Sequence, residues 1–158
     1  MLHVGGRNPA DLPRSQMVKT VIRNYQPSDY QAVKSILIEA GLFSPRSDTK
    51  QRLDRKITHQ PDSILVADIN KQIIGCIYLI KDHWVSLLFR FAISKKFRQQ
   101  SHGSKLLKKA ETLLKKQGFK TVILFVENDD KVLVSFYKKR GYRLGGINRC
   151  LIKPLEKN

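Results

Sequence analysis

Alternation between apolar and polar residues divides the chain into strand-like and helix-like segments. Strand-like runs, alternating or nearly continuous in apolar residues, occupy 20–25, 63–69, 72–80, 84–94 and 120–126. Only Asn70-Lys71 separates 63–69 from 72–80, which predicts a hairpin. The run 84–94 is apolar almost throughout, so we expect a central strand. Two further short strands are expected around Gly145-Gly146.

Four helices are predicted between these strands, three from apolar residues at helical spacing and a weaker one from the polar segment 47–60. Their approximate ranges are 28–41, 47–60, 104–118 and 129–141. Ser28 and Gln31 have the spacing of a capping box at the first helix, and Gly41 follows its last periodic residue. In the third helix, leucines line one face and lysines the other.

The order of these segments is β-α-α-β-β-β-α-β-α-β-β, which predicts a single α/β (α+β) domain with a mixed sheet. The strand–helix–strand unit over 84–126 predicts a right-handed parallel crossover. Its ligand site is expected at the carboxyl end of the 84–94 strand. We interpret residues 1–16, rich in Gly, Pro and polar residues, as a disordered leader, and 17–155 as the domain.

Charge is the unusual feature of the composition. The 158 residues include 30 Lys and Arg against 13 Asp and Glu, a net charge of +17. This excess favours polyanionic partners such as RNA, ribosomes, membrane surfaces or phosphorylated cofactors, unless the lysines are merely solvated. The sequence has no apolar run of the roughly 20 residues that a membrane span needs, which favours a cytoplasmic protein. Cys76 and Cys150 lie in strand-like runs, and we expect both to be buried free thiols rather than a disulfide.

A polar segment, FRQQSHG at 97–103, joins the 84–94 strand to the lysine-rich helix. Such a helix N-terminus offers unpaired N–H groups and a partial positive charge to an anion. Gly103 allows close approach of the backbone, and Arg98 adds a cation. The residues themselves therefore predict an anion-binding loop.

The hexapeptide Arg98-Gln99-Gln100-Ser101-His102-Gly103 resembles the signature of the GNAT family of N-acetyltransferases, (Arg/Gln)-x-x-Gly-x-(Gly/Ala) between a strand and a helix. TVIRNYQPSDY, NKQIIG and SFYKKRGY are similar to three further family segments, so the resemblance covers about 20–145. It implies the acyl-CoA N-acyltransferase fold and acetyl-CoA as co-substrate, and the sequence itself shows no metal-ligand cluster. It also implies a set of cofactor-binding residues: Phe91, Ala92 and Ile93 along the pantetheine, and Arg98, Gln99, Gln100, Ser101, His102, Gly103 and Ser104 around the phosphates.

Ser101 departs from the family pattern, which has glycine there. If the position requires a positive φ, serine costs on the order of 1 kcal/mol. If it does not, the hydroxyl can donate to a phosphate. The resemblance also implies Asp130 as a weak cofactor contact, although its sequence context suits a helix N-cap.

Two chemical roles follow from the resemblance. Tyr137 corresponds to the general acid that protonates the leaving thiolate, which a neutral phenol can do. The alternative is a core residue beside Phe136. A backbone N–H near Ile93 would polarise the thioester carbonyl.

The sequence does not single out one residue as the general base. The position that carries a glutamate in many members matches Phe125, and the nearest carboxylate, Glu127, would lie on the same strand face. Glu127 is either a base acting through a water or a solvated strand end. Arg90 either binds an acidic substrate group or lies at the surface. His102 contacts phosphate, acts as a base, or is solvated.

These observations predict an acetyl-CoA-dependent N-acetyltransferase that acts by direct transfer on a primary amine of a small molecule or protein. The alternative is a basic, RNA- or ribosome-associated module that keeps the fold and has weak or lost catalysis. Nucleic-acid binding is suggested by charge alone, and we expect a monomer or a homodimer without membrane association.

Overall fold

The computed structural model describes residues 19–127, 129–147 and 149–155. They form two compact units, one through Leu124 and one from Phe125 onward. The predicted leader, 1–16, and Met17 lie outside the described residues. The predicted beginning of the domain at residue 17 therefore stays a prediction.

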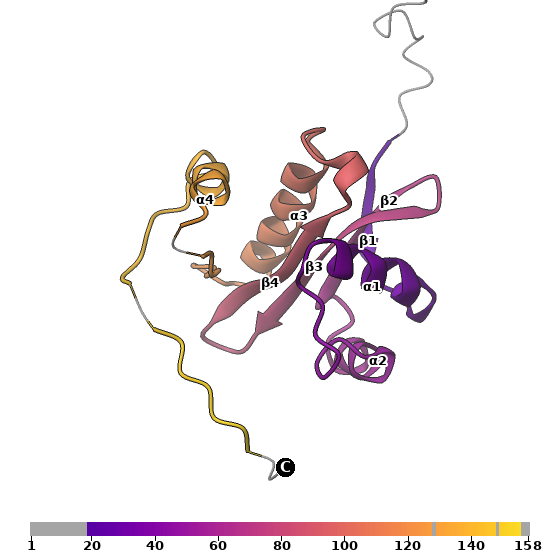
Figure 1. Cartoon of the computed structure of the whole chain (residues 1–158), viewed down its shortest axis with the longest axis horizontal. Helices are drawn as coiled ribbons and strands as arrows, with labels where there is room; N and C mark the ends of the chain where they lie inside the picture. Colours follow the sequence, from indigo (N-terminus) through magenta and orange to yellow (C-terminus); the bar gives the residue numbers. More distant parts are fainter. Residues whose placement is uncertain (1–18, 128, 148, 156–158) are drawn as a thin grey trace, which may run out of the picture. The chain divides into compact units, whose positions relative to one another are not determined.

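Four antiparallel strands in the order β1-β2-β3-β4 form the sheet of the first unit (Figure 1). They are β1 (Val21–Asn24), β2 (Ile64–Ile69), β3 (Gln72–Lys81) and β4 (Ser86–Ile93). Asn70 and Lys71, with φ of 51° and 67°, form the turn between β2 and β3 and confirm the predicted hairpin. Both residues are left-handed, as the tightest hairpin turns require.

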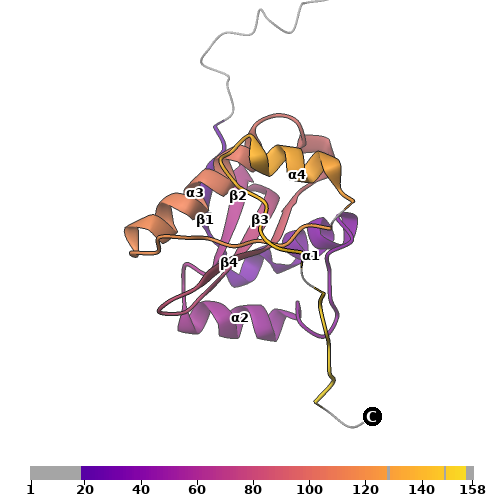
Figure 2. The same cartoon turned by 90° about the vertical axis from the view of Figure 1, so that its left-hand side faces the viewer.

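Two helices precede the hairpin and one follows β4. The first unit contains η3 (Pro27–Asp29), α1 (Tyr30–Glu39), α2 (Lys50–His59), η4 (Lys95–Phe97) and α3 (His102–Lys116). The side chain of Thr49 caps α2 by accepting from the Arg52 N–H. Figures 1 and 2 show α3 on one face of the sheet and α1 with α2 on the other.

The beginning of the first helix differs from the predicted capping box of Ser28 and Gln31. Pro27 instead begins a 3-10 turn, and the Asp29 carboxylate accepts the Gln26 N–H at 2.8 Å. The same carboxylate pairs with Arg23 at 2.7 Å. Asp29 caps this turn in place of Ser28, because its carboxylate accepts the Gln26 N–H and pairs with Arg23 at the same time.

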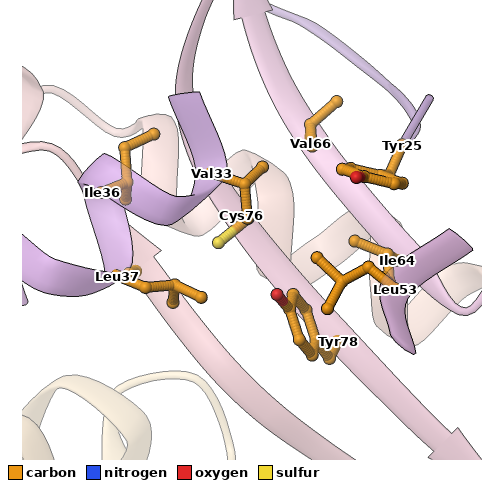
Figure 3. Close-up of a cluster of buried hydrophobic side chains, with 10 residues drawn as sticks. Tyr25, Val33, Ile36, Leu37, Leu53, Ile64, Val66, Cys76 and Tyr78 are labelled. Atoms are coloured by element: carbon orange, nitrogen blue, oxygen red, sulfur yellow. The ribbon is translucent and has the colours of Figure 1, made fainter. Parts of the chain in front are cut away.

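The main core cluster lies between α1, α2 and one face of the sheet (Figure 3). Its helix members are Val33, Ile36, Leu37 and Leu53, and its sheet members are Ile64, Val66, Cys76, Tyr78 and Ala92, with Tyr25 after β1. The thiol of Cys76 is buried, as predicted, and burial raises its pKa to about 12. On α3, the residues at helical spacing Leu106, Leu107, Ala110 and Leu114 are buried as well.

The predicted strand over 120–126 is reduced to one parallel bridge, Leu87↔Ile123. Leu88 N–H donates to Ile123 O at 2.8 Å, and Ile123 N–H donates to Ser86 O at 2.9 Å. The bridge confirms the predicted parallel crossover, but the rest of the segment forms no ladder, and Phe125 is 77% exposed. A strand needs a run of paired residues, which this segment does not have.

The second unit contains α4 (Lys131–Lys138) as its helix. The two strands predicted around Gly145-Gly146 do not form among the described residues 142–147 and 149–155. Cys150 is exposed, which corrects its predicted burial, because no strand encloses it. The fold class is confirmed, whereas the predicted element order holds only as far as α4 and without the strand between α3 and α4.

Candidate active site

The loop between β4 and α3 folds back on the end of the strand. After η4, Gln99 and Ser101 adopt left-handed φ values of 60° and 66°. The guanidinium of Arg98 donates through Nε to the carbonyl of Ile93 at 2.8 Å. This contact joins the loop to the last residue of β4, so the predicted cofactor residues 91–93 and 98–104 are brought together.

Ser101 is at the N-cap of α3, with φ 66° and ψ −1°. Its position thus has the positive φ that the family's glycine adopts easily, and serine is strained there. The Ser101 side chain makes no capping hydrogen bond. The helix ladder begins with the Lys105 N–H donating to Ser101 O at 3.0 Å. The N–H groups of His102 and Gly103 precede this ladder, which is the arrangement that binds an anion.

Gly103 allows α3 to begin close to β4. A Cβ on Gly103 would lie 3.4 Å from Phe91 Cζ and 3.5 Å from Ile93 Cγ1. The beginning of α3 therefore lies so close to the end of β4 that only a small side chain fits at position 103. The residues present fit a pyrophosphate-bearing cofactor, because the loop offers helix-end N–H groups together with Arg98, and Lys95, Lys96 and Lys105 add positive charge.

His102 is not solvated, which corrects one of its predicted alternatives. The residue is 9% exposed, its Nδ1 lies 2.8 Å from the Thr20 hydroxyl, and its ring packs edge-on to Phe97. Burial, and secondarily Lys105, lowers the pKa of His102. The side chain ties the beginning of α3 to the residue before β1, which makes it a structural part of the loop.

Arg90 is not free to bind an acidic substrate group through its Nε. That atom lies 3.1 Å and 3.4 Å from the two carboxylate oxygens of Asp48, which is buried in the loop between α1 and α2. Sequence reasoning missed Asp48, because a single aspartate before Thr49 reads as an ordinary loop residue. Its burial depends on a partner 42 positions away.

Tyr137 is buried on α4 of the second unit, between the rings of Phe136 and Tyr142 at centroid distances of 5.2 Å and 5.3 Å. Burial raises the pKa of Tyr137 to about 12, and Arg140 acts in the opposite direction. The phenol is therefore protonated at neutral pH, which both of its predicted roles, core residue and proton donor, allow.

Asp130 caps α4, as its context predicts, by accepting from the Leu133 N–H at 2.8 Å. Its charge is thus directed to the helix N-terminus. Glu127 is exposed and belongs to no strand, so its predicted place on a strand face with Phe125 is wrong. The described residues contain no cluster of three His, Cys, Asp or Glu able to hold a metal. None of the described helices is long and apolar enough to cross a membrane.

The family model described as the acetyltransferase (GNAT) family matches residues 29–142. The chain belongs to this family. The matched range contains the loop at 98–104 and continues into the second compact unit as far as Tyr142. Membership confirms the resemblance seen in the hexapeptide.

Named relatives agree with this assignment. An acetyltransferase of Pectobacterium atrosepticum is 26% identical over 121 residues, which cover 77% of this chain and 86% of the relative. A Yersinia pestis protein named as an uncharacterized N-acetyltransferase is 24% identical over 77% and 86%. Together with the family model, these matches make the chain an N-acetyltransferase. They give no support to the alternative of an RNA-binding module.

Solved structures show the same fold. The PaiA N-acetyltransferase of Thermoplasma acidophilum, in complex with coenzyme A, has a TM-score of 0.73 and 23% identity, over 82% of this chain and 93% of that one. The ribosomal-protein-S18-alanine N-acetyltransferase of Escherichia coli has a TM-score of 0.69 and 19% identity, over 83% and 82%. At these identities the likeness concerns the fold.

Proposed function

We propose that this GNAT protein transfers the acetyl group of acetyl-CoA directly to a primary amine. The observation that carries the proposal is the beginning of α3. An uncapped helix N-terminus lies directly after a loop with two left-handed residues, and Arg98 joins that loop to the end of β4. The solved relative from Thermoplasma acidophilum, which contains coenzyme A, supports this choice of co-substrate.

In this proposal, the backbone N–H groups of His102 and Gly103 bind the pyrophosphate. Arg98 and the exposed loop side chains Gln99, Gln100 and Ser101 contribute donors. Ser104, in the same first turn of α3, is the last of the proposed phosphate contacts. The edge of β4 at Phe91, Ala92 and Ile93 aligns the pantetheine as an added strand would. Asp130 is the weakest of the proposed cofactor contacts, because its carboxylate already caps α4.

The chemistry is one acyl transfer. The amine nitrogen attacks the thioester carbon, the carbon–sulfur bond breaks, and the acetyl group forms an amide. The Ile93 N–H polarises the carbonyl oxygen, and the Tyr137 phenol gives its proton to the leaving thiolate. The attacking nitrogen loses its proton to a base, for which Glu127, acting through a water, is the candidate.

Replacement of Tyr137 by Phe tests the acid. We expect turnover to fall by ~10²–10⁴-fold, because the hydroxyl acts only as the thiolate leaves. Acetyl-CoA affinity and the melting temperature should stay nearly unchanged, because the ring remains packed. The measurement is coenzyme A release with a panel of primary amines, with mass spectrometry of the acetylated product.

Tyr142→Phe is the matched control, because it removes a hydroxyl from the neighbouring ring of the same cluster. Full activity of Tyr137→Phe would refute the acid and leave Tyr137 as a core residue. Glu127→Gln tests the base in the same assay. Unchanged turnover across pH in that variant would assign deprotonation of the amine to solvent.

A further inference from the structure

A β-bulge interrupts β4 just before the proposed pantetheine edge. Cys76 pairs with Ala92 and Tyr78 pairs with Phe89, so the single residue Ile77 of β3 lies opposite both Arg90 and Phe91. Arg90 has a φ of 51°, in the left-handed region. Glycine is the usual residue at such a position, so the fold must hold an arginine there at a cost.

The bulge determines which peptide groups face the outer edge of β4. Before it, Leu88 N–H donates outward to Ile123 O, and after it, Ser94 N–H donates inward to Ile74 O. Successive residues of a strand point their N–H and C=O groups to opposite sides. Because the N–H of Ser94 points inward, the N–H of Ile93 points to the outer edge. Without the extra residue the alternation would shift by one, and Ala92 would face outward in its place.

A buried ion pair holds the bulge. The Arg90 Nε lies 3.1 Å from Asp48 Oδ2, and the two side chains are only 15% and 4% exposed. Asp48 is itself fixed, because its Oδ2 accepts the Ser44 N–H at 2.7 Å and its carbonyl accepts the Tyr30 hydroxyl at 3.2 Å. The guanidinium also lies 4.6 Å from the centre of the Phe89 ring.

The carbonyl of Arg90 is held from the other side. It accepts from the buried thiol of Cys76, with a sulfur–oxygen distance of 3.6 Å, a weak contact. The side chain and the carbonyl of Arg90 are thus held by Asp48 and Cys76, which come from the α1–α2 loop and from β3. The conformation of Arg90 is therefore determined by tertiary contacts, because its own preference opposes it.

We propose that Asp48 and Arg90 are positioning residues for acetyl transfer. Their ion pair holds the left-handed bulge, and the bulge directs the Ile93 N–H at the thioester carbonyl. Neither side chain touches the co-substrate. This inference rests on the proposed function, because it assigns the Ile93 N–H the role given to it there.

The test compares two double variants, Asp48→Asn with Arg90→Gly and Asp48→Asn with Arg90→Ala. Both lack the ion pair and the buried charge, but only glycine adopts a positive φ at little cost. We expect Asp48→Asn alone to lower kcat at least tenfold. The glycine double variant should recover most of that loss and the alanine double variant should not, with little change in the KM for acetyl-CoA.

Hydrogen exchange of the Ser94 amide, which donates to Ile74, supplies a readout independent of activity. Its protection should survive in the glycine double variant and fall in the alanine one. Equal turnover in the two double variants, or native turnover in Asp48→Asn, would overturn the positioning role.

Absence of transfer by the native chain would overturn the proposed function, and with it the role of the pair in transfer. Hydrogen exchange would still show whether the pair holds the bulge. A failure of the proposed function is therefore distinguishable from a failure of the ion-pair inference.

Discussion

The segment from β1 to α3 and the segment after Leu124 differ in how far their apolar side chains are buried. In the first, Leu37, Ile77 and Leu106 have no exposed surface, and strands pair along their length. In the second, Ile147 and Leu151 are 89% and 92% exposed, and α4 is the regular element of the described part. The proposed cofactor loop thus belongs to the densely packed segment, whereas the proposed acid belongs to the other.

Tertiary packing against the sheet therefore determines where the loop before α3 lies. His102 and Arg98 are held by contacts to Thr20 and Ile93, in or beside the sheet, and Gly103 lies close to the side chains of β4. Tyr137 packs against two rings of its own neighbourhood, Phe136 and Tyr142. We therefore expect substitutions in the two segments to have very different effects on stability.

Truncation of matched leucines should give the largest contrast. Leu107 is 1% exposed on α3, and Leu107→Ala should lower the free energy of unfolding by ~2–5 kcal/mol, through lost burial and a cavity. Leu151→Ala should change it by less than about 0.5 kcal/mol. Urea denaturation measures both. A similar cost for the two variants would show that residues 149–155 pack as tightly as the core.

Alanine at matched glycines should give the next largest contrast. A Cβ on Gly75 would lie 2.3 Å from Ile93 Cδ1 and 2.9 Å from the Ala92 carbonyl oxygen, so Gly75→Ala should cost ~1–3 kcal/mol. Gly145 has no atom within 4 Å of its added Cβ, and Gly145→Ala should be nearly neutral. Thermal melts of the two variants provide the check, and an undisturbed Gly75→Ala would contradict the close approach of β3 and β4.

Backbone strain at Ser101, in the loop before α3, should appear as a smaller effect of opposite sign. Ser101 has a φ of 66°, so Ser101→Gly should raise the free energy of unfolding by up to about 1 kcal/mol. Ser104→Gly, within the first turn of α3, should lower it by a similar amount. Chemical denaturation of the pair tests the assignment. Loss of stability in both variants would mean that Ser101 is not strained.

The smallest effect concerns pH. The lowered pKa of His102 means that the unfolded chain binds this proton more readily than the folded one. Its contribution to stability is complete above the usual histidine pKa of about 6.5 and is lost as pH falls through the lowered value. Melting temperatures between about pH 7 and 5 should fall less in His102→Asn than in the native chain. An identical slope in His102→Asn and in the native chain would refute the assignment.

Local signals in the sequence predicted much of the densely packed segment. Asn70-Lys71 marked the hairpin, and the leucine spacing of α3 marked its buried face. The loop at 98–104 could be predicted because a polar run between a strand and a helix is typical of an anion-binding helix N-terminus, which is a local feature.

Non-local partners explain what the sequence did not reveal. His102 bonds Thr20 across 82 positions, and Asp48 meets Arg90 across 42. The bulge was hidden because an arginine occupies its left-handed position. The strand predicted over 120–126 has the right composition, but it pairs with β4 at only one bridge.

The proposed function requires that the loop before α3 binds the phosphates of acetyl-CoA. Titration calorimetry with coenzyme A and with pantetheine, which lacks those phosphates, tests it most directly. We predict saturable binding of coenzyme A and at least tenfold weaker binding of pantetheine, a difference of about 1.4 kcal/mol or more. Equal affinities for the two ligands, or no saturable binding of coenzyme A, would contradict the claim.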